Sequence, residues 1–278
     1  TAKEVTDIEA SFVADPFVFR QADRWYLFFE ALDRRTKKGV IALAQSQDGL
    51  NWRYDRVVLA EPFHLSYPFV FEWQGQHYLI PEMGEMNSIQ LYRAENFPYD
   101  WRFERELLKG KPFNDTTLVH RDGRWWLFTA IHPYVDDTLE LYFASDLFGP
   151  WTAHPKNPIV AKDPDRARPA GRVIEMQGRL VRYAQKNRFY YGRDVSAREI
   201  VKLTTEEYEE KEIPGAPFAS KGHGRWNRDG MHHIHPLKIN DYEWRAFVDG
   251  FSWNFLWGRH KSTDLSALSR LFAKKNER

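Results

Sequence analysis

Acidic residues recur at the ends of strand-like segments in this sequence. Asp15 and Asp115 each begin an apolar segment, whereas Glu30 and Glu82 each end one. Several carboxyl groups in one partly desolvated site have pKa values that are pushed apart, so that one can serve as an acid and another as a base. Cleavage of a glycosidic bond needs such a pair beside the bond. We therefore predict that Asp15, Glu82 and Asp115 are catalytic, and that Glu30 contacts the substrate.

Each of these carboxylates also has a structural interpretation. An Asp before a Pro at a strand start, as at Asp15, can accept backbone N–H bonds in a turn. The functional interpretation is stronger for the set than for any one member, because a closed ring of repeats brings distant segments to one axis.

Other polar and aromatic residues could bind a substrate near the same axis. His232, His233 and His235 resemble a metal cluster, but the sequence offers no further ligand at zinc spacing. We predict no metal site and no required cofactor, and we expect a water or an ion near His235. The predicted substrate-binding residues are Tyr67, Glu30, Arg168, His233, His235 and Trp226.

Four cations offer a second kind of site. Arg168, Arg225, Arg228 and Lys221 could form an anion pocket with the histidines, since arginine recognises phosphate or carboxylate through paired hydrogen bonds. The alternative is that these residues are charges on surface loops.

A repeated pattern of strands positions all these residues. The segments at Asp15 and Glu30 return at Tyr67 and Glu82, in each case 52 residues later. Further copies begin near residues 115, 171 and 235. A period near 50 residues indicates one supersecondary unit per repeat, which cannot bury its apolar face alone. Four strands per repeat predict an all-β fold, a five-bladed β-propeller with four antiparallel strands per blade.

The expected organisation is one domain over residues 1–278. The expected blades are 11–60, 61–110, 111–160, 161–215 and 216–256. After them Ser262-Thr263-Asp264 can cap a helix with apolar positions at 265, 268, 271 and 272. This pattern predicts a short C-terminal helix over 263–275.

Charge and composition exclude several classes of protein. The 40 Lys and Arg residues balance 39 Asp and Glu residues, so no global field holds nucleic acid or an anionic membrane. The chain has no Cys, which excludes disulfides and thiolate metal sites. No signal peptide or membrane span is visible, so we expect a soluble protein and predict no particular compartment. Aromatic residues make up 16% of the chain, enough for a few to line a sugar-binding cleft.

Five motifs together resemble one domain family. They are Ala14-Asp15-Pro16-Phe17, the segment 66–73, Ile80-Pro81-Glu82, the segment 167–171 and the segment 229–233. The set resembles the N-terminal domain of glucosamine inositolphosphorylceramide transferases and its stand-alone bacterial relatives. The resemblance covers nearly the whole chain. In the plant proteins of that name the transferase activity is attributed to a separate C-terminal domain, so a neighbouring enzyme domain is an expected partner.

The blade pattern is more distantly similar to the five-bladed glycoside hydrolases that act on arabinans and xylans. That resemblance implies Asp15 as the base and His235 as a residue near an axial ion. The sequence departs from the pattern at Tyr67, where those enzymes have an Asp, and at Asp115, where they have a Glu. Glu82 is then a candidate for the acid.

Three hypotheses follow for the function. The first is a carbohydrate-active propeller that cleaves or transfers a glycosyl unit with paired carboxylates. The second is a glycan-binding module without catalysis that serves a neighbouring enzyme. The third is a phosphate- or sugar-nucleotide-dependent glycosyl-transfer enzyme that uses the Arg and His residues.

Overall fold

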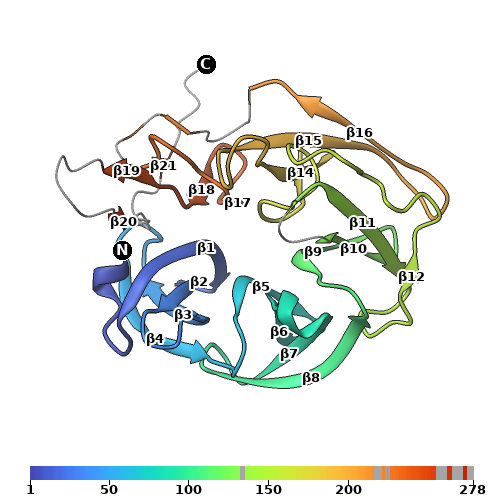
Figure 1. Cartoon of the computed structure of the whole chain (residues 1–278). Helices are drawn as coiled ribbons and strands as arrows, with labels where there is room; N and C mark the ends of the chain where they lie inside the picture. The colour runs from blue at the N-terminus through green and yellow to red at the C-terminus, as the bar shows by residue number, and fades with distance from the viewer. Residues whose placement is uncertain are drawn as a thin grey trace.

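The computed structural model describes residues 1–131, 135–215, 221–222, 224, 226–254, 262–264 and 272–273. Over these residues the fold is an all-β propeller (Figure 1). Its described helices are two single 3-10 turns, Ala2–Glu4 and Gly84–Met86. No helix in the described part of the chain is long and apolar enough to cross a membrane.

Four sheets of four antiparallel strands form the first four blades, and each runs along the chain without crossovers. Blade one contains β1 (Ala10–Gln21), β2 (Arg24–Asp33), β3 (Gly39–Ser46) and β4 (Arg53–Leu59). Blade two contains β5 (Ser66–Trp73), β6 (Gln76–Glu82), β7 (Ser88–Asn96) and β8 (Asp100–Lys109). Blade three contains β9 (Asn114–Arg121), β10 (Arg124–Ile131), β11 (Thr138–Ala144) and β12 (Thr152–Ala153). Blade four contains β13 (Ile174–Met176), β14 (Arg179–Lys186), β15 (Asp194–Leu203) and β16 (Tyr208–Ile213).

The prediction of five four-stranded blades is wrong for the described residues. After blade four, β17 (Ile234–Lys238), β18 (Trp244–Val248) and β21 (Phe272–Ala273) form a three-stranded C-terminal sheet. The next strand along the chain, β19 (Ser252–Asn254), leaves this sheet and pairs with β20 (Ser262–Asp264). Among its described residues, the last segment of the chain therefore forms no four-stranded sheet.

The predicted C-terminal helix over 263–275 is also wrong where the structure describes that segment. Residues 263–264 belong to β20 and residues 272–273 to β21. Pairing with β19 and with β18 supplies these short segments with strand hydrogen bonds, so tertiary contacts override the helical spacing of the apolar residues. Residues 265–271 and 274–275 lie outside the described part of the chain.

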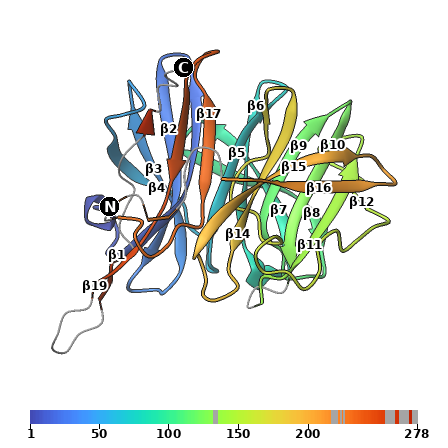
Figure 2. The same cartoon turned by 90° about the horizontal axis from the view of Figure 1, so that it is seen from above.

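Apolar clusters at every junction close the ring of sheets. Blades one, two and three share a cluster that includes Phe28, Leu79 and Leu127. Blades three and four meet through Phe128 and Ile200. The C-terminal sheet packs on blade four at Ile234 and Val181, and on blade one at Phe247 and Trp25. In two views the orange and red strands of this sheet lie between the blue strands of blade one and the yellow strands of blade four (Figures 1 and 2).

Candidate functional site

The inner strands of the first three blades share a bulge that aims one side chain toward the axis. In each blade three residues of the inner strand span two residues of its neighbour, between Ala14 and Phe17 in β1 and at the matching places in β5 and β9. Asp15, Tyr67 and Asp115 occupy these bulges with φ values of 53°, 44° and 49°. Positive φ is unfavourable for such residues and recurs at binding and catalytic sites, where bulges redirect side chains.

Asp249, which follows β18, organises the residues around Asp15. Its Oδ1 accepts hydrogen bonds from the backbone N–H groups of His232 and His233 at 3.1 and 2.9 Å. Its Oδ2 accepts the N–H of Asp15 at 3.2 Å and lies 2.9 Å from Nδ1 of His232. The other ring nitrogen of His232, Nε2, lies 3.4 Å from Oδ1 of Asp15. His232 therefore lies between two carboxyl groups.

The charges in this group shift their pKa values in opposite directions. Burial alone would lower the pKa of His232, but the carboxylates of Asp249, Asp15 and Asp115 outweigh it and raise the pKa to about 9. Burial would raise the pKa of Asp249, but His232 lowers it to about 2. Burial raises the pKa of Asp15 to about 7, with His232 opposing the rise and Asp115 and Asp249 adding to it. These shifts favour a positively charged ring of His232 beside a carboxyl group of Asp15 that ionises less readily than a free one.

Glu30 is a second buried carboxyl group beside Asp15. The residue opposite Glu30 in the sheet is Ala14, and only 5% of Glu30 is exposed. Its Oε1 has no hydrogen-bond partner among the described residues and lies 3.4 Å from Nε2 of His64. Burial, followed by the charges of Asp15 and Glu82, raises the pKa of Glu30 well above its usual value. Each of the carboxyl groups of Glu30 and Asp15 therefore opposes the ionisation of the other.

Asp115 forms a buried ion pair with Arg168 from the segment before β13. Arg168 Nε donates to Oδ2 of Asp115 at 2.5 Å, and Nη2 donates to Oδ1 at 3.4 Å. Gln185 Nε2 donates to the same Oδ2 at 2.9 Å. On its other side Arg168 Nη1 donates to Asp136 at 2.9 Å. Burial raises the pKa of Asp115, and Arg168 opposes that rise. Both oxygens of Asp115 and both sides of Arg168 are therefore engaged within the protein.

Glu82 is likewise held by protein donors. Ser66 Oγ donates to Oε2 at 2.6 Å, and the backbone N–H of Gly84 donates to Oε1 at 2.7 Å. Asn114 Nδ2, from blade three, donates to Oε1 at 3.1 Å. Glu82 therefore ties blade two to blade three in this arrangement, and neither of its oxygens is left without a protein donor.

Tyr67 lies inside the axis rather than at its mouth, because it is fully buried. Its hydroxyl lies 2.7 Å from Thr117 Oγ1, donates to the carbonyl of Gly171 at 3.0 Å and accepts the N–H of Gly171 at 2.8 Å. His233 is also fully buried, with its ring 5.4 Å from that of Tyr67 and 4.6 Å from that of Phe17. These side chains fill the axis beside Asp15 and link three blades, and their contact with a substrate stays a prediction.

His235 is buried deeper along the axis. Its Nδ1 accepts the backbone N–H of Val18 at 2.9 Å, and its Nε2 lies 3.1 Å from Nε of Arg172. The guanidinium of Arg172 also lies 4.4 Å from the ring of Phe69. The place beside His235 where an axial ion was expected is therefore taken by a side-chain cation of the protein.

The predicted anion pocket does not come together as a set of free cations. Lys221 Nζ donates to the hydroxyl of Tyr190 at 2.9 Å, and Arg228 donates to Asp229 at 2.9 Å. Arg168 is held by two carboxylates, and Arg225 lies outside the described residues. Trp226 packs at the side of the cluster between blade four and the C-terminal sheet.

The sequence prediction missed two residues at the centre of the site. From the sequence, His232 is singled out only within a run of histidines, and no role is predicted for Asp249. Asp249 directly follows the second strand of its repeat, near whose ends Glu30 and Glu82 lie in their own repeats. This similar position within the repeat is the feature of the sequence that could have identified Asp249.

Asp15, His232 and Asp249 are also the residues, among those described, whose ligand atoms lie close enough to hold a metal ion, within 4.8 Å of one another. The contacts of Asp249 and His232 also hold the three residues together as a hydrogen-bonded and charged group around Asp15.

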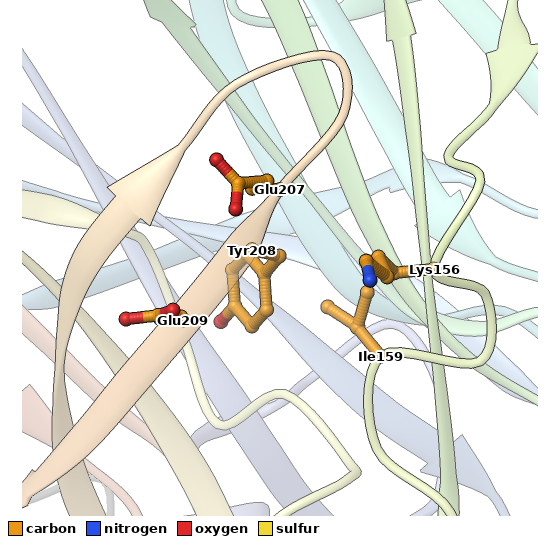
Figure 3. A pocket seen from close by; sticks show the side chains of 5 residues that line it. All are labelled: Lys156, Ile159, Glu207, Tyr208 and Glu209. Atoms are coloured by element: carbon orange, nitrogen blue, oxygen red, sulfur yellow. The ribbon is translucent and has the colours of Figure 1, made fainter.

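A separate open pocket lies on the outer edge of blade four, away from these residues. Lys156, Ile159, Glu207, Tyr208 and Glu209 line it (Figure 3). Tyr208 donates to Glu210, which also binds Arg182 and Arg198 in a buried network between β14, β15 and β16. The network joins the outer strands of blade four beside the pocket.

Comparison with known proteins identifies relatives along nearly the whole described chain. The sequence profile described as "Glucosamine inositolphosphorylceramide transferase 1, N-terminal" matches residues 1–251. The rice (Oryza sativa subsp. japonica) protein named Glucosamine inositolphosphorylceramide transferase 1 is 40% identical over 250 residues, covering 87% of this chain and 33% of its own. The protein of the same name from Arabidopsis thaliana is 38% identical, covering 87% and 32%. The chain spans about a third of the length of these relatives, and because all are plant proteins they give no support to the expected bacterial origin.

Solved structures share the fold at low sequence identity. The catalytic domain of the Coprinopsis cinerea GH62 α-L-arabinofuranosidase superposes with a TM-score of 0.68 and 14% identity, covering 91% of this chain and 88% of that one. The Cellvibrio cellulosa α-L-arabinanase complexed with arabinohexaose gives 0.60 and 18%, covering 87% and 88%. These likenesses establish a fold shared with glycoside hydrolases. By its sequence, the chain belongs to the family of the N-terminal domain of glucosamine inositolphosphorylceramide transferase 1.

Proposed function

We propose that this propeller cleaves or transfers a glycosyl unit, with Asp15 as the base and Glu30 as the proton donor. The observation that carries the proposal is the placement of Asp15, whose Oδ1 lies 3.4 Å from a histidine held by Asp249, next to a buried Glu30 without a hydrogen bond on Oε1. Support also comes from the names of the relatives, which are transferases, and from a fold shared with glycoside hydrolases.

The proposed step is a general acid–base displacement. The attacking oxygen, from water or from an acceptor hydroxyl, loses its proton to Asp15 as it bonds to the anomeric carbon. The glycosidic C–O bond breaks, and its oxygen takes the proton of Glu30. Water as the attacking group gives hydrolysis, and a sugar or polyol hydroxyl gives transfer. The positive ring of His232 stabilises the Asp15 carboxylate, so that this carboxyl is ionised in part of the population near neutral pH.

Glu82 and Asp115 have positioning roles in this proposal. Glu82 holds the turn after β6 against blade three through Gly84 and Asn114. Asp115 fixes Arg168, whose charge opposes the rise in the pKa of Asp15. Their predicted roles as acids are less favoured because their oxygens are already engaged by protein donors.

A glycan-binding module without catalysis is the second candidate. It is favoured by the hydrogen bonds that Glu82 and Asp115 accept from protein donors, and by the side chains that fill the axis. In that case the chain would present a glycan to a neighbouring enzyme domain, which is consistent with a match to one third of each relative.

Turnover by matched variants tests the proposal. Wild type, Asp15→Asn, Glu30→Gln and the exposed control Asp23→Asn are incubated with aryl glycosides of pentoses and hexoses and with arabinohexaose, with and without an added acceptor alcohol. Mass spectrometry then detects released sugar or transfer product. We expect the two site variants to lose more than 100-fold in rate while their thermal unfolding midpoints stay near that of the wild type. Unchanged turnover in Asp15→Asn removes Asp15 from the mechanism. Saturable binding without any product in the wild type favours the binding module.

A further inference from the structure

Three consecutive aromatic residues are exposed in the loop between β14 and β15. Phe189, Tyr190 and Tyr191 are 77%, 38% and 49% exposed. Burial of an aromatic side chain contributes substantially to stability, and exposed apolar surface gathered in one place marks interaction sites. By contrast Tyr242, in the turn between β17 and β18, is exposed at 89% without aromatic neighbours in sequence. The loop therefore displays aromatic surface that the fold itself does not use.

A side-chain cation contacts each residue of the run. Arg193 lies 5.4 Å from the ring centre of Phe189 and Arg168 lies 5.1 Å from that of Tyr191, whereas Lys221 donates a hydrogen bond to the hydroxyl of Tyr190. Such contacts attract the cation to the electron-rich face and restrict the orientation of the ring. The three rings are consequently supported from within the protein, although large parts of them face solvent.

Hydrogen bonds also fix the backbone and flanks of the loop. Asn187 Oδ1 accepts the N–H of Gly192 at 2.8 Å, and Asn187 Nδ2 donates to Asp136 at 3.2 Å. Tyr190 donates its hydroxyl proton to the carbonyl of Asp229 at 2.6 Å. A surface that is already ordered loses less conformational entropy when a ligand binds. The loop thus has the rigidity of a binding surface as well as its exposed area.

The aromatic run ends, at Tyr191, directly beside the candidate site. The ring of Tyr191 lies 5.3 Å from the ring of His232, and the same Arg168 that supports Tyr191 binds Asp115. Through His232, the ring of Tyr191 is therefore one side chain away from Asp15.

We propose that Phe189, Tyr190 and Tyr191 form an aromatic platform for the sugar rings of an oligosaccharide next to the residue held at Asp15. The C–H bonds on one face of a sugar ring are apolar, and they pack against the face of an aromatic ring, whereas the hydroxyl groups stay in water. This inference rests on the proposed function, because it names the chemistry of a substrate for the same site. It assigns an oligosaccharide of at least two or three sugars, rather than a single sugar.

Binding measured without turnover tests the platform separately from the catalytic proposal. The probe is a glycan array of neutral pentose and hexose oligosaccharides of two to six residues, arabinohexaose included. Wild type and Asp15→Asn are compared with the same proteins carrying Phe189→Ala or Phe189→Trp, and Tyr242→Ala serves as the control for a lone exposed aromatic residue. We expect wild type to bind one class of these oligosaccharides, Phe189→Ala to weaken that binding about tenfold, and Phe189→Trp and Tyr242→Ala to retain it.

Two outcomes overturn the platform. One is the absence of binding to every oligosaccharide of the array, and the other is equal binding by wild type and Phe189→Ala. The catalytic proposal fails in a different way, through lack of product or through turnover that survives Asp15→Asn. If the protein binds oligosaccharides through Phe189 but forms no product, the platform is supported and the catalytic proposal is rejected.

Discussion

Nε2 of His232 lies 3.4 Å from Oδ1 of Asp15, although the two residues are more than 200 positions apart in the chain. The contact joins blade one to the segment before the C-terminal sheet. Burial raises the pKa of Asp15, and His232 is the strongest group opposing that rise. The ring therefore sets how much of the Asp15 carboxyl is ionised at neutral pH.

The first prediction is that His232→Asn moves the acid limb of the activity profile to higher pH. Asp15, with a pKa of about 7, must lose its proton to act as a base, so activity in the wild type rises as pH increases through about 7. Removal of the positive ring leaves burial, Asp115 and Asp249 to raise that pKa further. The measurement is the dependence of kcat/KM on pH between 5 and 9. An acid limb that stays in place contradicts the tuning role of His232. The control is His120→Asn, at an exposed position near the end of β9.

The second prediction concerns the ion pair of Asp115 and Arg168. Asp115→Asn leaves Arg168 buried with Asp136 alone, and the loss of one partner of a buried pair costs about 3 kcal/mol in the free energy of unfolding. Arg168→Met alone leaves Asp115 without its cation and should cost a similar amount. The double variant should be less destabilised than the sum of the two, because neither charge is then left unpaired. Chemical denaturation of the four proteins measures this coupling, and strictly additive losses would contradict it.

The repeat in the sequence predicts the positions of several residues of the candidate site. Asp15, Tyr67 and Asp115 were aligned from their spacing, and all three occupy the same bulge with positive φ. The alignment succeeds because a repeat must bury the same face in each blade, which fixes the register of its inner strands.

The same alignment could not distinguish free carboxyl groups from engaged ones. Glu30 and Glu82 occupy equivalent positions, because each is paired with the residue before the bulge of the inner strand. Glu82 accepts hydrogen bonds from Ser66, Gly84 and Asn114, whereas Oε1 of Glu30 has no such donor among the described residues. Asn114 comes from the neighbouring blade and Gly84 from a single turn, and the repeat does not encode either contact. The C-terminal helix was predicted wrongly for a related reason. The pairing of β19 with β20 depends on tertiary contacts, which the spacing of the apolar residues does not reveal.

The third prediction is that Tyr67→Phe destabilises the protein. The hydroxyl of Tyr67 meets Thr117 and both backbone groups of Gly171, so its removal leaves buried donors and acceptors without partners. The expected loss is about 2 kcal/mol in the free energy of unfolding. Tyr183→Phe is the matched control, since Tyr183 is equally buried and its hydroxyl has no hydrogen-bond partner among the described residues. That control should be neutral or slightly stabilising, and equal losses in the two variants would contradict a linking role for the Tyr67 hydroxyl.

The fourth prediction concerns stability in acid. Burial lowers the pKa of His233 to about 3, so the folded protein does not protonate this ring between pH 6.5 and 3, whereas the unfolded chain does. As pH falls through that window, His233 therefore removes stability at a rate on the order of 1 kcal/mol per pH unit. The raised pKa of Asp15 acts in the opposite direction between about pH 7 and 3.8, because there the folded state holds the additional proton.

The contribution of His233 appears in the difference between the wild type and His233→Leu. Leu fills a similar volume between Phe17 and Tyr67 and removes two buried ring nitrogens that have no hydrogen-bond partner among the described residues. We expect the variant to be as stable as the wild type near pH 7 and to gain on it steadily as pH falls from 6.5 to 4. Denaturant titrations at several pH values give the two curves, with Ile234→Val as a neighbouring variant that carries no titratable group. Curves for wild type and His233→Leu that stay parallel over this range would mean that the buried ring takes up a proton as readily in the folded protein as in the unfolded chain.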